Sequence, residues 1–391
     1  MIIAADAAIP YANEAFSELG DLHLYSAREL KPDHIRDADA LVVRSVTPVN
    51  DSLLEGSSVR FVAAASAGID HIDQEYLKAR GIRFAYAAGC NADSVSEYVV
   101  TALHVVASRK GWKLKGKSLA VIGAGNTGSR VARKARALGM DVVLCDPPLR
   151  DATGDDRYRP FEEAVDADIL SFHVPLSIMP PYPTWHMVDR NAMERFSSRQ
   201  FLINTSRGPV IDNQELASAL RRGCIEGAIL DVWEGEPVFS EDLLNLVDIG
   251  TPHIAGTAID GKIRATEMTR NALCEYLGRS PEKDLASFYP EARSVRPQPA
   301  REGQENVLSV LRQTFDIMKT DKLFRTLAGL SPSQAAASFE KLRTQHPLRP
   351  EFRHFTVDLD KFHIDLAGTY ESLGFQIKIA EDSASAERRL A

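Results

Sequence analysis

The chain has 391 residues, of which 44% are apolar and 26% are charged, a composition typical of globular proteins with two or three domains. Its net charge of −8 argues against a general nucleic-acid binder, and no apolar run approaches the length of a membrane span. The first residues lack the basic start of a secretory signal, and the four cysteines are scattered without metal-ligand spacing. We therefore expect a cytoplasmic protein with free thiols and no metal site.

The first hundred residues alternate short apolar runs with helix-like stretches. Such an alternation predicts a parallel sheet with helices on both faces. A long helix is expected from about Ser94 to Lys110, and it leads into a glycine-rich stretch. The predicted strands are MIIAAD, LHLYS, ALVVRS, VRFVAAAS and IRFAYAA, separated by helical segments such as YANEAFSELG and QEYLKARG.

The stretch VIGAGNTGSRVARKARALGMDVVLCDP, residues 121–147, has the pattern of a dinucleotide site. A buried strand precedes the G-x-G-x-x-G motif, a helix follows it, and a second strand ends at Asp146. The helix N-terminus offers N–H groups to a pyrophosphate, and Asp146 is expected to accept hydrogen bonds from the adenosine ribose. Because its charge repels a 2′-phosphate, NAD is favoured over NADP. The predicted cofactor contacts here are Gly123, Gly125, Asn126, Thr127, Gly128 and Asp146.

Three polar residues follow three successive predicted strands in the next segment. Arg207 follows FLINTS, Glu236 follows GAILDVW, and His253 follows VDIGTP. Taken singly, each has a plainer interpretation, because loop Arg and Glu are usually exposed and a lone His is usually structural. Since parallel strands end at one edge of a sheet, we expect the three side chains to form one site.

The residue types match the oxidation of a 2-hydroxy acid. Histidine titrates in the range suited to taking the hydroxyl proton, and a carboxylate can hold its imidazole in one tautomer. Arginine can bind a substrate carboxylate with two hydrogen bonds. Asp231 ends a strand and could meet the nicotinamide amide, although capping of nearby N–H groups is the alternative.

The rest of the chain predicts a helix that returns to the first domain, and then an additional module. GKIRATEMTRNALCEYLG forms the helix, and ARSVRPQPARE is expected to be a surface connection. The module has helical stretches at ENVLSVLRQTFDIMKTDKLFRTLAG and PSQAAASFEKLRTQ, and strands at FRHFTVDL and FQIKIA. We expect a substrate domain at 1–98 and 257–286, an NAD domain at 99–256, and a C-terminal α+β domain at 287–391.

The motifs VIGAGNTGSRVA, NTSRGPVID, ILDVWEGEP and TPHIAG resemble those of the D-isomer-specific 2-hydroxyacid dehydrogenases, over roughly the first 280 residues. The resemblance implies two doubly wound parallel-sheet domains, a flavodoxin-like substrate domain and a Rossmann NAD domain. It implies Arg207, Glu236 and His253 as catalytic residues. It also implies NAD contacts at Asp146, Val174, Asp231 and Gly256, and substrate contacts at Ser45, Ser66 and Thr257.

Two positions depart from the family pattern. Thr257 stands where the family usually has Tyr, and Val174 stands where Thr is common, so a hydroxyl contact is lost at Val174 while a backbone contact to the cofactor survives. Arg44, beside Ser45 at a predicted strand end, could hold a phosphate or carboxylate of the substrate, but an exposed structural arginine is the alternative.

Further stretches, LVVRSVTPVN, SAGIDHID, AAGCNADSVSEYV and HIAGTAIDGK, are most similar to family members that oxidise a phosphorylated four-carbon hydroxy acid. The additional C-terminal module shares this likeness, which implies that it forms a homodimer. The expected partners are thus the phosphorylated substrate and a second copy of the chain, with no nucleic acid and no membrane. Two alternatives remain: a D-2-hydroxyacid dehydrogenase acting on another substrate such as 3-phosphoglycerate, and an NAD-sensing protein that recruits partners.

Overall fold

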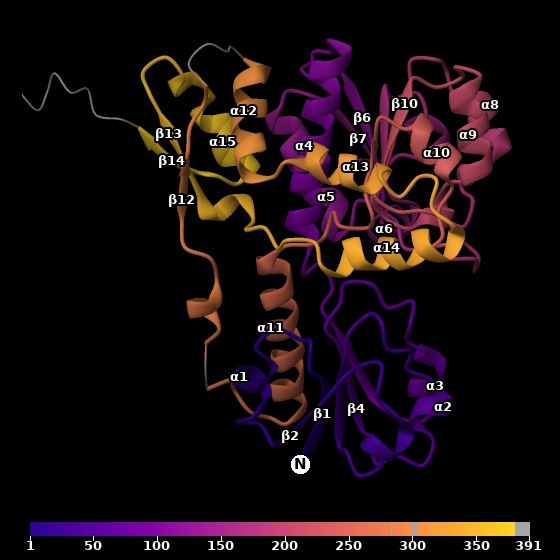
Figure 1. The fold of residues 1–391 in the computed structure, drawn as a ribbon, viewed down its shortest axis with the longest axis vertical. Helices are drawn as coiled ribbons and strands as arrows, with labels where there is room; N and C mark the ends of the chain where they lie inside the picture. Colours follow the sequence, from indigo (N-terminus) through magenta and orange to yellow (C-terminus); the bar gives the residue numbers. More distant parts are fainter. Residues whose placement is uncertain (283, 299–302, 380–391) are drawn as a thin grey trace, which may run out of the picture. The chain divides into compact units, whose positions relative to one another are not determined.

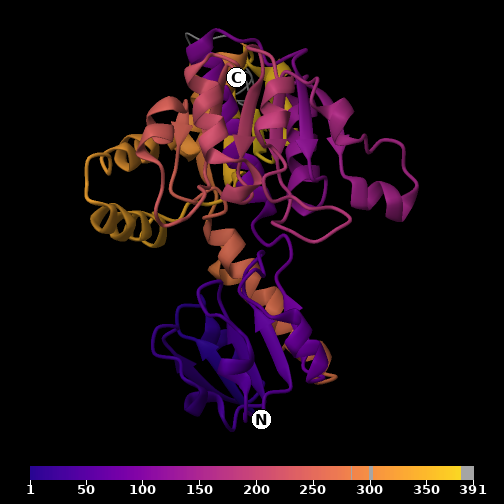
Figure 2. The ribbon, with the colours of Figure 1, turned by 90° about the vertical axis from the view of Figure 1, so that its right-hand side faces the viewer.

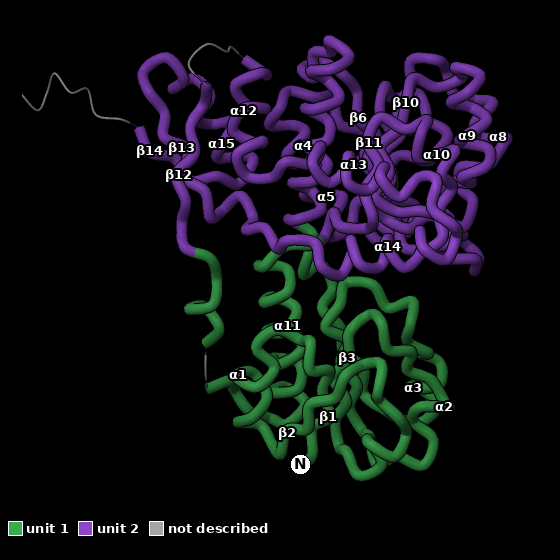
Figure 3. Tube along the Cα trace, viewed as in Figure 1, with its two compact units in different colours: residues 1–92, 257–290 green, residues 93–256, 291–391 purple. Residues whose placement is uncertain are grey.

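The computed structural model describes residues 1–282, 284–298 and 303–379 (Figure 1). The chain divides into two compact units, coloured separately in Figure 3. Unit 1 comprises residues 1–92 and 257–290, and unit 2 comprises residues 93–256 and 291–391. Within the described ranges, no helix combines the length and the apolar character needed to cross a membrane.

Unit 1 is built on a five-stranded parallel sheet with the order β2-β1-β3-β4-β5. All five strands predicted for the first hundred residues are present. The central strands β3 and β4 are buried along their whole length, as in sheets covered on both faces. The strands are β1 (Ile2–Asp6), β2 (Asp21–Tyr25), β3 (Ala40–Val43), β4 (Phe61–Ala64) and β5 (Arg83–Tyr86).

Helices cover both faces of this sheet because successive strand residues point to opposite sides. Ile3 and Ala5 of β1 pack with α1 (Ala12–Phe16) and α11 (Ile259–Tyr276), whereas Ala4 belongs to the core of the other face. That second core receives α2 (Asp51–Leu54) and α3 (Gln74–Ala79). Figure 2 shows α11 running along the sheet of unit 1, so the predicted return of this helix to the first domain is confirmed.

Unit 2 contains a six-stranded parallel sheet with the order β11-β10-β9-β8-β6-β7. The chain goes from β6 outward to β7 and then back across β6 to β8, so the strand order reverses at β6. Ligands of doubly wound sheets bind at such a reversal, beyond the carboxyl ends of the strands. The strands are β6 (Ser118–Ile122), β7 (Asp141–Cys145), β8 (Ile169–Phe172), β9 (Phe201–Asn204), β10 (Gly227–Leu230) and β11 (Ile249–Gly250).

Two apolar cores lie on the two faces of this sheet. One contains side chains of α4 (Ala92–Lys110) and α5 (Asn126–Ala137), and the other contains side chains of α9 (Asn213–Arg221) and α10 (Glu241–Leu246). The predicted doubly wound α/β class is thereby confirmed for both units. The remaining helices around the sheet are α6 (Pro147–Thr153), α7 (Phe161–Ala164) and α8 (Arg190–Arg195).

The C-terminal part of unit 2 adds a three-stranded parallel sheet and four helices. The sheet consists of β12 (Arg293–Val295), β13 (Phe355–Leu359) and β14 (Gln376–Ile379) in that order. The helices are α12 (Gln304–Thr314), α13 (Ile317–Arg325), α14 (Pro332–Thr344) and α15 (Ala367–Leu373). The last residues of the predicted C-terminal domain, 380–391, lie outside the described residues.

Two predictions in this part are wrong in detail. The stretch expected to be a surface connection contains strand β12, whose pairing with β13 buries Val295. The single helical stretch expected at 305–329 is two helices, because Asp316 accepts a hydrogen bond from the N–H of Lys319 and starts α13.

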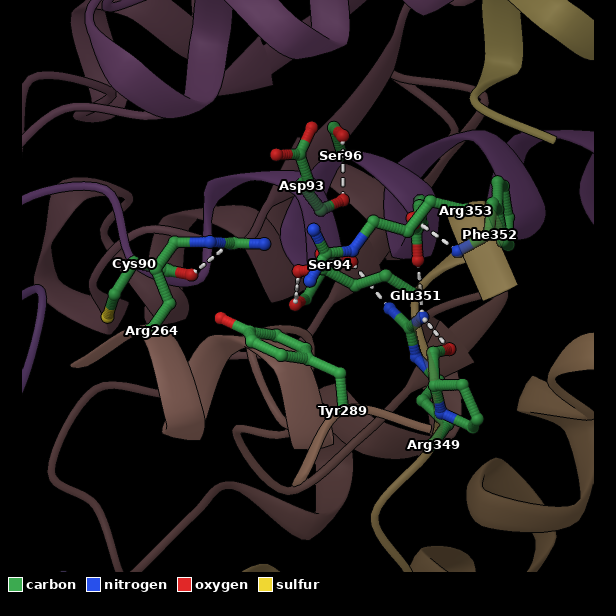
Figure 4. A network of polar contacts seen from close by, with 12 residues as sticks. Cys90, Asp93, Ser94, Ser96, Arg264, Tyr289, Arg349, Glu351, Phe352 and Arg353 are labelled. Atoms are coloured by element: carbon green, nitrogen blue, oxygen red, sulfur yellow. Dashed lines mark hydrogen bonds and ion pairs between the residues drawn. The ribbon is translucent and has the colours of Figure 1, made fainter. Parts of the chain in front are cut away.

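A buried polar network attaches the C-terminal part to α4 (Figure 4). The Arg349 guanidinium donates to the Ser94 carbonyl at 2.6 Å. It also lies 2.5 Å from the Glu97 carboxylate. The Ser94 hydroxyl donates to Glu351 at 2.8 Å, and the Phe352 N–H donates to Glu97 at 2.8 Å. Because each buried charge has several partners, this attachment fixes one packing of the two segments.

Candidate active site

The glycine loop after β6 has the shape that a pyrophosphate requires. A Cβ at Gly128 would lie 1.9 Å from the Gly123 carbonyl oxygen, so the protein's own packing demands glycine there. A Cβ at Gly125, the N-cap residue of α5, would meet nothing within 4 Å. Among the described residues, no side chain caps the first N–H groups of α5, which starts with Asn126 and Thr127. The space at Gly125 and these donors fit the phosphates of a dinucleotide.

Asp146 lies at the end of β7, as the motif predicts. Its Oδ2 accepts from the N–H of Ala124 at 2.8 Å, and its Oδ1 accepts from the N–H of Leu149 at 3.0 Å. The carboxylate therefore connects the glycine loop to the start of α6, a structural task that the sequence analysis missed. The Asp-Pro-Pro sequence was the available signal, since Asp is a preferred N-cap and Pro a preferred first residue.

The segment after β8 lies against the glycine loop. A Cβ at Gly123 would lie 2.9 Å from the Val174 side chain, so Val174 is placed beside the predicted cofactor contacts. Burial lowers the pKa of the neighbouring His173 to about 3, and its ring nitrogens contact the hydroxyls of Ser171 and Thr205. His173 is thus a neutral, packed histidine.

Arg207, Glu236 and His253 follow β9, β10 and β11, three neighbouring parallel strands. Leu230 of β10 pairs with Asn204 of β9 and with Gly250 of β11, so the three strands end at the same level. The structure places the following loops together at this edge.

Glu236 and His253 form the central contact of the site. The imidazole Nδ1 lies 2.7 Å from Glu236 Oε2, while Glu236 Oε1 accepts from the N–H of Trp233 at 2.7 Å. Burial disfavours the imidazolium, but the hydrogen bond and charge of Glu236, with the charge of Asp231, outweigh it and raise the pKa of His253. Because Nδ1 is engaged by a carboxylate, the neutral ring carries its proton there and leaves Nε2 as the basic atom.

Asp231 organises the loop that carries His253. Its carboxylate accepts from the N–H groups of Ile254 and Ala255, both at 2.8 Å, and from the Thr251 hydroxyl at 2.6 Å. Burial raises its pKa, since these donors and His253 compensate only part of the desolvation. The N–H capping weighed in the sequence analysis is therefore present, and the nicotinamide contact stays a prediction.

Arg207 is brought close to this pair by an unusually tight approach of two loops. A Cβ at Gly208 would lie 2.0 Å from the Trp233 carbonyl oxygen, so only glycine permits the loop after β9 to contact the loop after β10. The Arg207 guanidinium donates to the Ser206 carbonyl at 2.8 Å, and its positive charge offsets a small part of the rise in the pKa of His253. Gly208 and Trp233 are structural members of the site that the sequence analysis did not single out.

The predicted substrate contacts all belong to unit 1. One of them, Arg44, has a partner that the sequence did not indicate. Its Nε donates to Asp6 Oδ2 at 2.7 Å, and the Asp6 side chain is 3% exposed. Ser45 is exposed, and the half-buried Ser66 donates its hydroxyl to the Gly68 carbonyl at 2.8 Å. Gly256 ends the first segment of unit 2, and Thr257 begins the second segment of unit 1.

Comparison with known proteins decides the family. Residues 95–255 match the family model "D-isomer specific 2-hydroxyacid dehydrogenase, NAD binding domain". Over 381 residues, 97% of this chain and 100% of the relative, the chain is 40% identical to erythronate-4-phosphate dehydrogenase of Yersinia enterocolitica. The enzyme of the same name from Salinibacter ruber is 41% identical over 365 residues, 91% of this chain and 93% of the relative. The chain belongs to the erythronate-4-phosphate dehydrogenase family.

Solved structures agree with this assignment. The Aquifex aeolicus D-lactate dehydrogenase, in complex with NAD and lactic acid, is 25% identical with a TM-score of 0.57, covering 71% of this chain and 96% of its own. The TT0316 protein from Thermus thermophilus is also 25% identical, with a TM-score of 0.61 over 73% of this chain and 100% of its own. The chain is accordingly an NAD-dependent oxidoreductase, and the resemblance seen in its motifs is confirmed.

Proposed function

We propose that this enzyme oxidises the C2 hydroxyl of 4-phospho-D-erythronate to (R)-3-hydroxy-2-oxo-4-phosphobutanoate, a step of pyridoxal 5′-phosphate biosynthesis. The observation that carries the proposal is the Glu236–His253 contact of 2.7 Å, with Arg207 nearby, at the carboxyl edge of the NAD-binding sheet. The substrate follows from the relatives' name, erythronate-4-phosphate dehydrogenase.

In this proposal His253 is the general base. Its Nε2 takes the proton of the C2 hydroxyl as the carbonyl forms. NAD, when bound, would supply the acceptor for the hydride that leaves C2. The raised pKa of His253 makes the imidazole a stronger base, and the Glu236 carboxylate stabilises the imidazolium that results. In the reverse direction the same imidazolium returns the proton.

Arg207 is assigned to the substrate carboxylate. A guanidinium can bind a carboxylate with two parallel hydrogen bonds and polarise the adjacent C2 oxygen. The distal phosphate is assigned to unit 1, with Arg44, Ser45, Ser66 and Thr257 as its predicted contacts. Since Thr257 is shorter than the Tyr usual in the family, more of this task falls on Arg44.

The NAD contacts are proposed on the geometry of unit 2. The open space at Gly125 and the first N–H groups of α5 suit the pyrophosphate, and Asp146 suits the adenosine ribose. Asp146 already accepts two backbone N–H bonds, but a carboxylate has further lone pairs for ribose hydroxyls. The remaining proposed contacts are Asn126, Thr127, Val174, Asp231 and Gly256.

The direct test is substrate-dependent NADH formation by the purified enzyme. We expect reduction of NAD with 4-phospho-D-erythronate, much weaker reduction with unphosphorylated erythronate, and weak reduction with 3-phosphoglycerate. A carbonyl trap such as hydrazine removes the 2-oxo product and draws the reaction forward. A clear preference for 3-phosphoglycerate would support a different dehydrogenase. NAD binding without turnover of any hydroxy acid would support the NAD-sensing alternative.

We also propose that the enzyme is a cytoplasmic homodimer assembled through residues 287–391. Apolar side chains of this part are exposed in the single chain. Phe362 is 76% exposed, and Ile379, on the edge strand β14, is 51% exposed. Two-fold association would cover such side chains. Light scattering of the full chain should give the mass of a dimer, and Phe362→Asp should shift it toward the monomer.

A further inference from the structure

His253 follows a strand that has little support of its own. β11 has two residues, stands at one end of the sheet order, and pairs with β10. Its outer edge is covered by α13 from the C-terminal part, which Figure 3 labels beside β11. An uncovered strand edge leaves N–H and C=O groups without strand partners, so the contacts of α13 here decide how firmly the strand is held.

Asp321 of α13 contacts this edge directly. Its Oδ1 accepts from the N–H of Gly250 at 2.8 Å, and the residue is 3% exposed. Gly250 is the last residue of β11 and stands three residues before His253. A buried carboxylate needs compensation, which comes from Arg325 one turn later, whose Nε lies 3.0 Å from both carboxylate oxygens.

Arg325 extends the contact to the chain segment before β11. Its two terminal nitrogens donate to the carbonyls of Leu244 and Val247, the latter at 2.9 Å. These carbonyls lie at the C-terminal end of α10 and just beyond it, where helical carbonyls lack partners. Together, Asp321 and Arg325 bind three backbone groups of the segment from Leu244 to Gly250. We call this pair and its three contacts the α13 clamp.

The short segment between Gly250 and His253 is held by hydrogen bonds, so a shift of Gly250 would also shift His253. The Thr251 carbonyl accepts from the Trp233 indole at 2.9 Å, and the Thr251 hydroxyl donates to Asp231 at 2.6 Å. His253 has a φ of +57°, in the left-handed region that strains a residue with a side chain. Such a conformation persists only when its surroundings fix it.

We infer that Asp321 and Arg325 are positioning residues for His253, so that the segment after residue 290 supports the chemistry as well as any assembly. Neither side chain is assigned a contact with substrate or cofactor; both act through the backbone of β11. The inference rests on the proposed role of His253 as general base.

The test compares three variants of the full-length enzyme. Asp321→Ala removes the Gly250 contact, and Asp321→Asn keeps an oxygen acceptor for that N–H while removing the charge. Arg343→Ala is the control, because Arg343 forms an i,i+3 ion pair with Glu340 on α14 at 3.1 Å, in the same C-terminal part. Arg325→Lys supplies a milder change if Asp321→Ala does not fold.

Kinetics with 4-phospho-D-erythronate provide the first measurement. We expect Asp321→Ala to lower kcat about ten- to a hundredfold with an unchanged KM for NAD, because a base displaced by about 1 Å loses that much rate. The primary isotope effect with C2-deuterated substrate should rise in this variant. A merely structural loss would reduce the amount of active enzyme and leave the isotope effect unchanged. Arg343→Ala should stay close to the parent enzyme. Asp321→Asn, which keeps the acceptor for Gly250 but turns its NH₂ toward Arg325, should lose less rate than Asp321→Ala.

The second measurement needs no turnover: the pKa of His253, followed by NMR with labelled histidine and assigned with His253→Gln. The charged groups that act on this ring are Glu236, Asp231 and Arg207, and all remain in the variants. A loosened contact with Glu236 should lower the pKa of His253 in Asp321→Ala and lower it less in Asp321→Asn. Equal lowering in both variants would assign the effect to charge, and unchanged kinetics and pKa in a folded Asp321→Ala would overturn the inference. If the proposed function alone were wrong, the parent enzyme itself would be inactive on 4-phospho-D-erythronate.

Discussion

Replacing Glu236 with Gln tests the base assignment most directly, because both oxygens of this side chain act as hydrogen-bond acceptors in the site. Glu236 Oε1 accepts from the N–H of Trp233 and Oε2 contacts Nδ1 of His253, both at 2.7 Å. Glutamine has one acceptor and one NH₂ donor in the same shape. In Glu236→Gln, one of the two contacts must therefore be lost, whichever way the amide turns.

Both orientations of the amide impair catalysis. With its oxygen toward Trp233, the NH₂ faces Nδ1 of His253 and forces the ring proton onto Nε2, which can then no longer accept the substrate proton. With its oxygen toward His253, the NH₂ opposes the Trp233 N–H, and an unsatisfied buried N–H costs about 1–3 kcal/mol. That cost leaves the productive orientation populated at roughly one part in 5 to one part in 150. We therefore expect kcat to fall roughly 5- to 150-fold, less than for loss of the base itself.

The pH profile provides an independent check. Removing the carboxylate removes the contacts that raise the pKa of His253, so this pKa should fall. Oxidation needs the neutral imidazole, so the acid limb of kcat/KM should move to lower pH; reduction needs the imidazolium, so its alkaline limb should also move to lower pH. Glu234→Gln is the matched control, because Glu234 contacts His186 at 2.7 Å. If Glu236→Gln kept the turnover and the pH profiles of the parent enzyme, the assignment of His253 as general base would be refuted.

Three further predictions concern the cofactor, the phosphate and the loop approach. Asp146→Asn should keep the fold but narrow the preference for NAD over NADP in binding titrations, because it removes the charge; unchanged discrimination would place Asp146 away from the ribose. Arg44→Ala should raise the KM for phosphoerythronate about ten- to a hundredfold and lower stability by about 1–3 kcal/mol, since it strands the buried Asp6 carboxylate. Asp6→Asn added to it should restore the melting temperature but not KM; restoration of both would make Arg44 structural. Gly208→Ala should lower the free energy of unfolding by about 1–3 kcal/mol and reduce kcat. Gly125→Ala should leave the free energy of unfolding unchanged and raise the KM for NAD. Equal unfolding curves for the two variants would contradict the packing argument.

Much of the fold and of the candidate site could be predicted because its signals are local. Buried parallel strands are continuous apolar runs, and the glycine motif lies within one strand-turn-helix unit. The grouping of Arg207, Glu236 and His253 needed one further step, that parallel strands end at one edge. This rule uses chain order alone and requires no knowledge of packing.

The contacts that could not be predicted join residues far apart in the chain. Nothing near Arg44 indicates Asp6, and nothing near Gly250 indicates Asp321. A lone charged residue on an amphipathic helix is usually exposed, so its burial against a strand edge leaves no periodic pattern. Strand β12 was missed for a related reason, since its three residues gain their conformation from pairing with β13.

The placement of His253 gives a physical reason for the extra C-terminal part. The proposed base, His253, has a strained backbone with a φ of +57°, after a two-residue strand at the sheet edge. On its inner side the strand is bonded to β10, while Tyr98 of α4 lies 2.6 Å from the Thr251 hydroxyl. On its outer side the strand would face solvent unless another segment covered it. The α13 clamp provides that cover, and the buried network of Arg349 and Glu97 fixes the same C-terminal part to α4. The edge that carries the base is therefore held from both sides, which a reaction sensitive to displacements of about 1 Å requires.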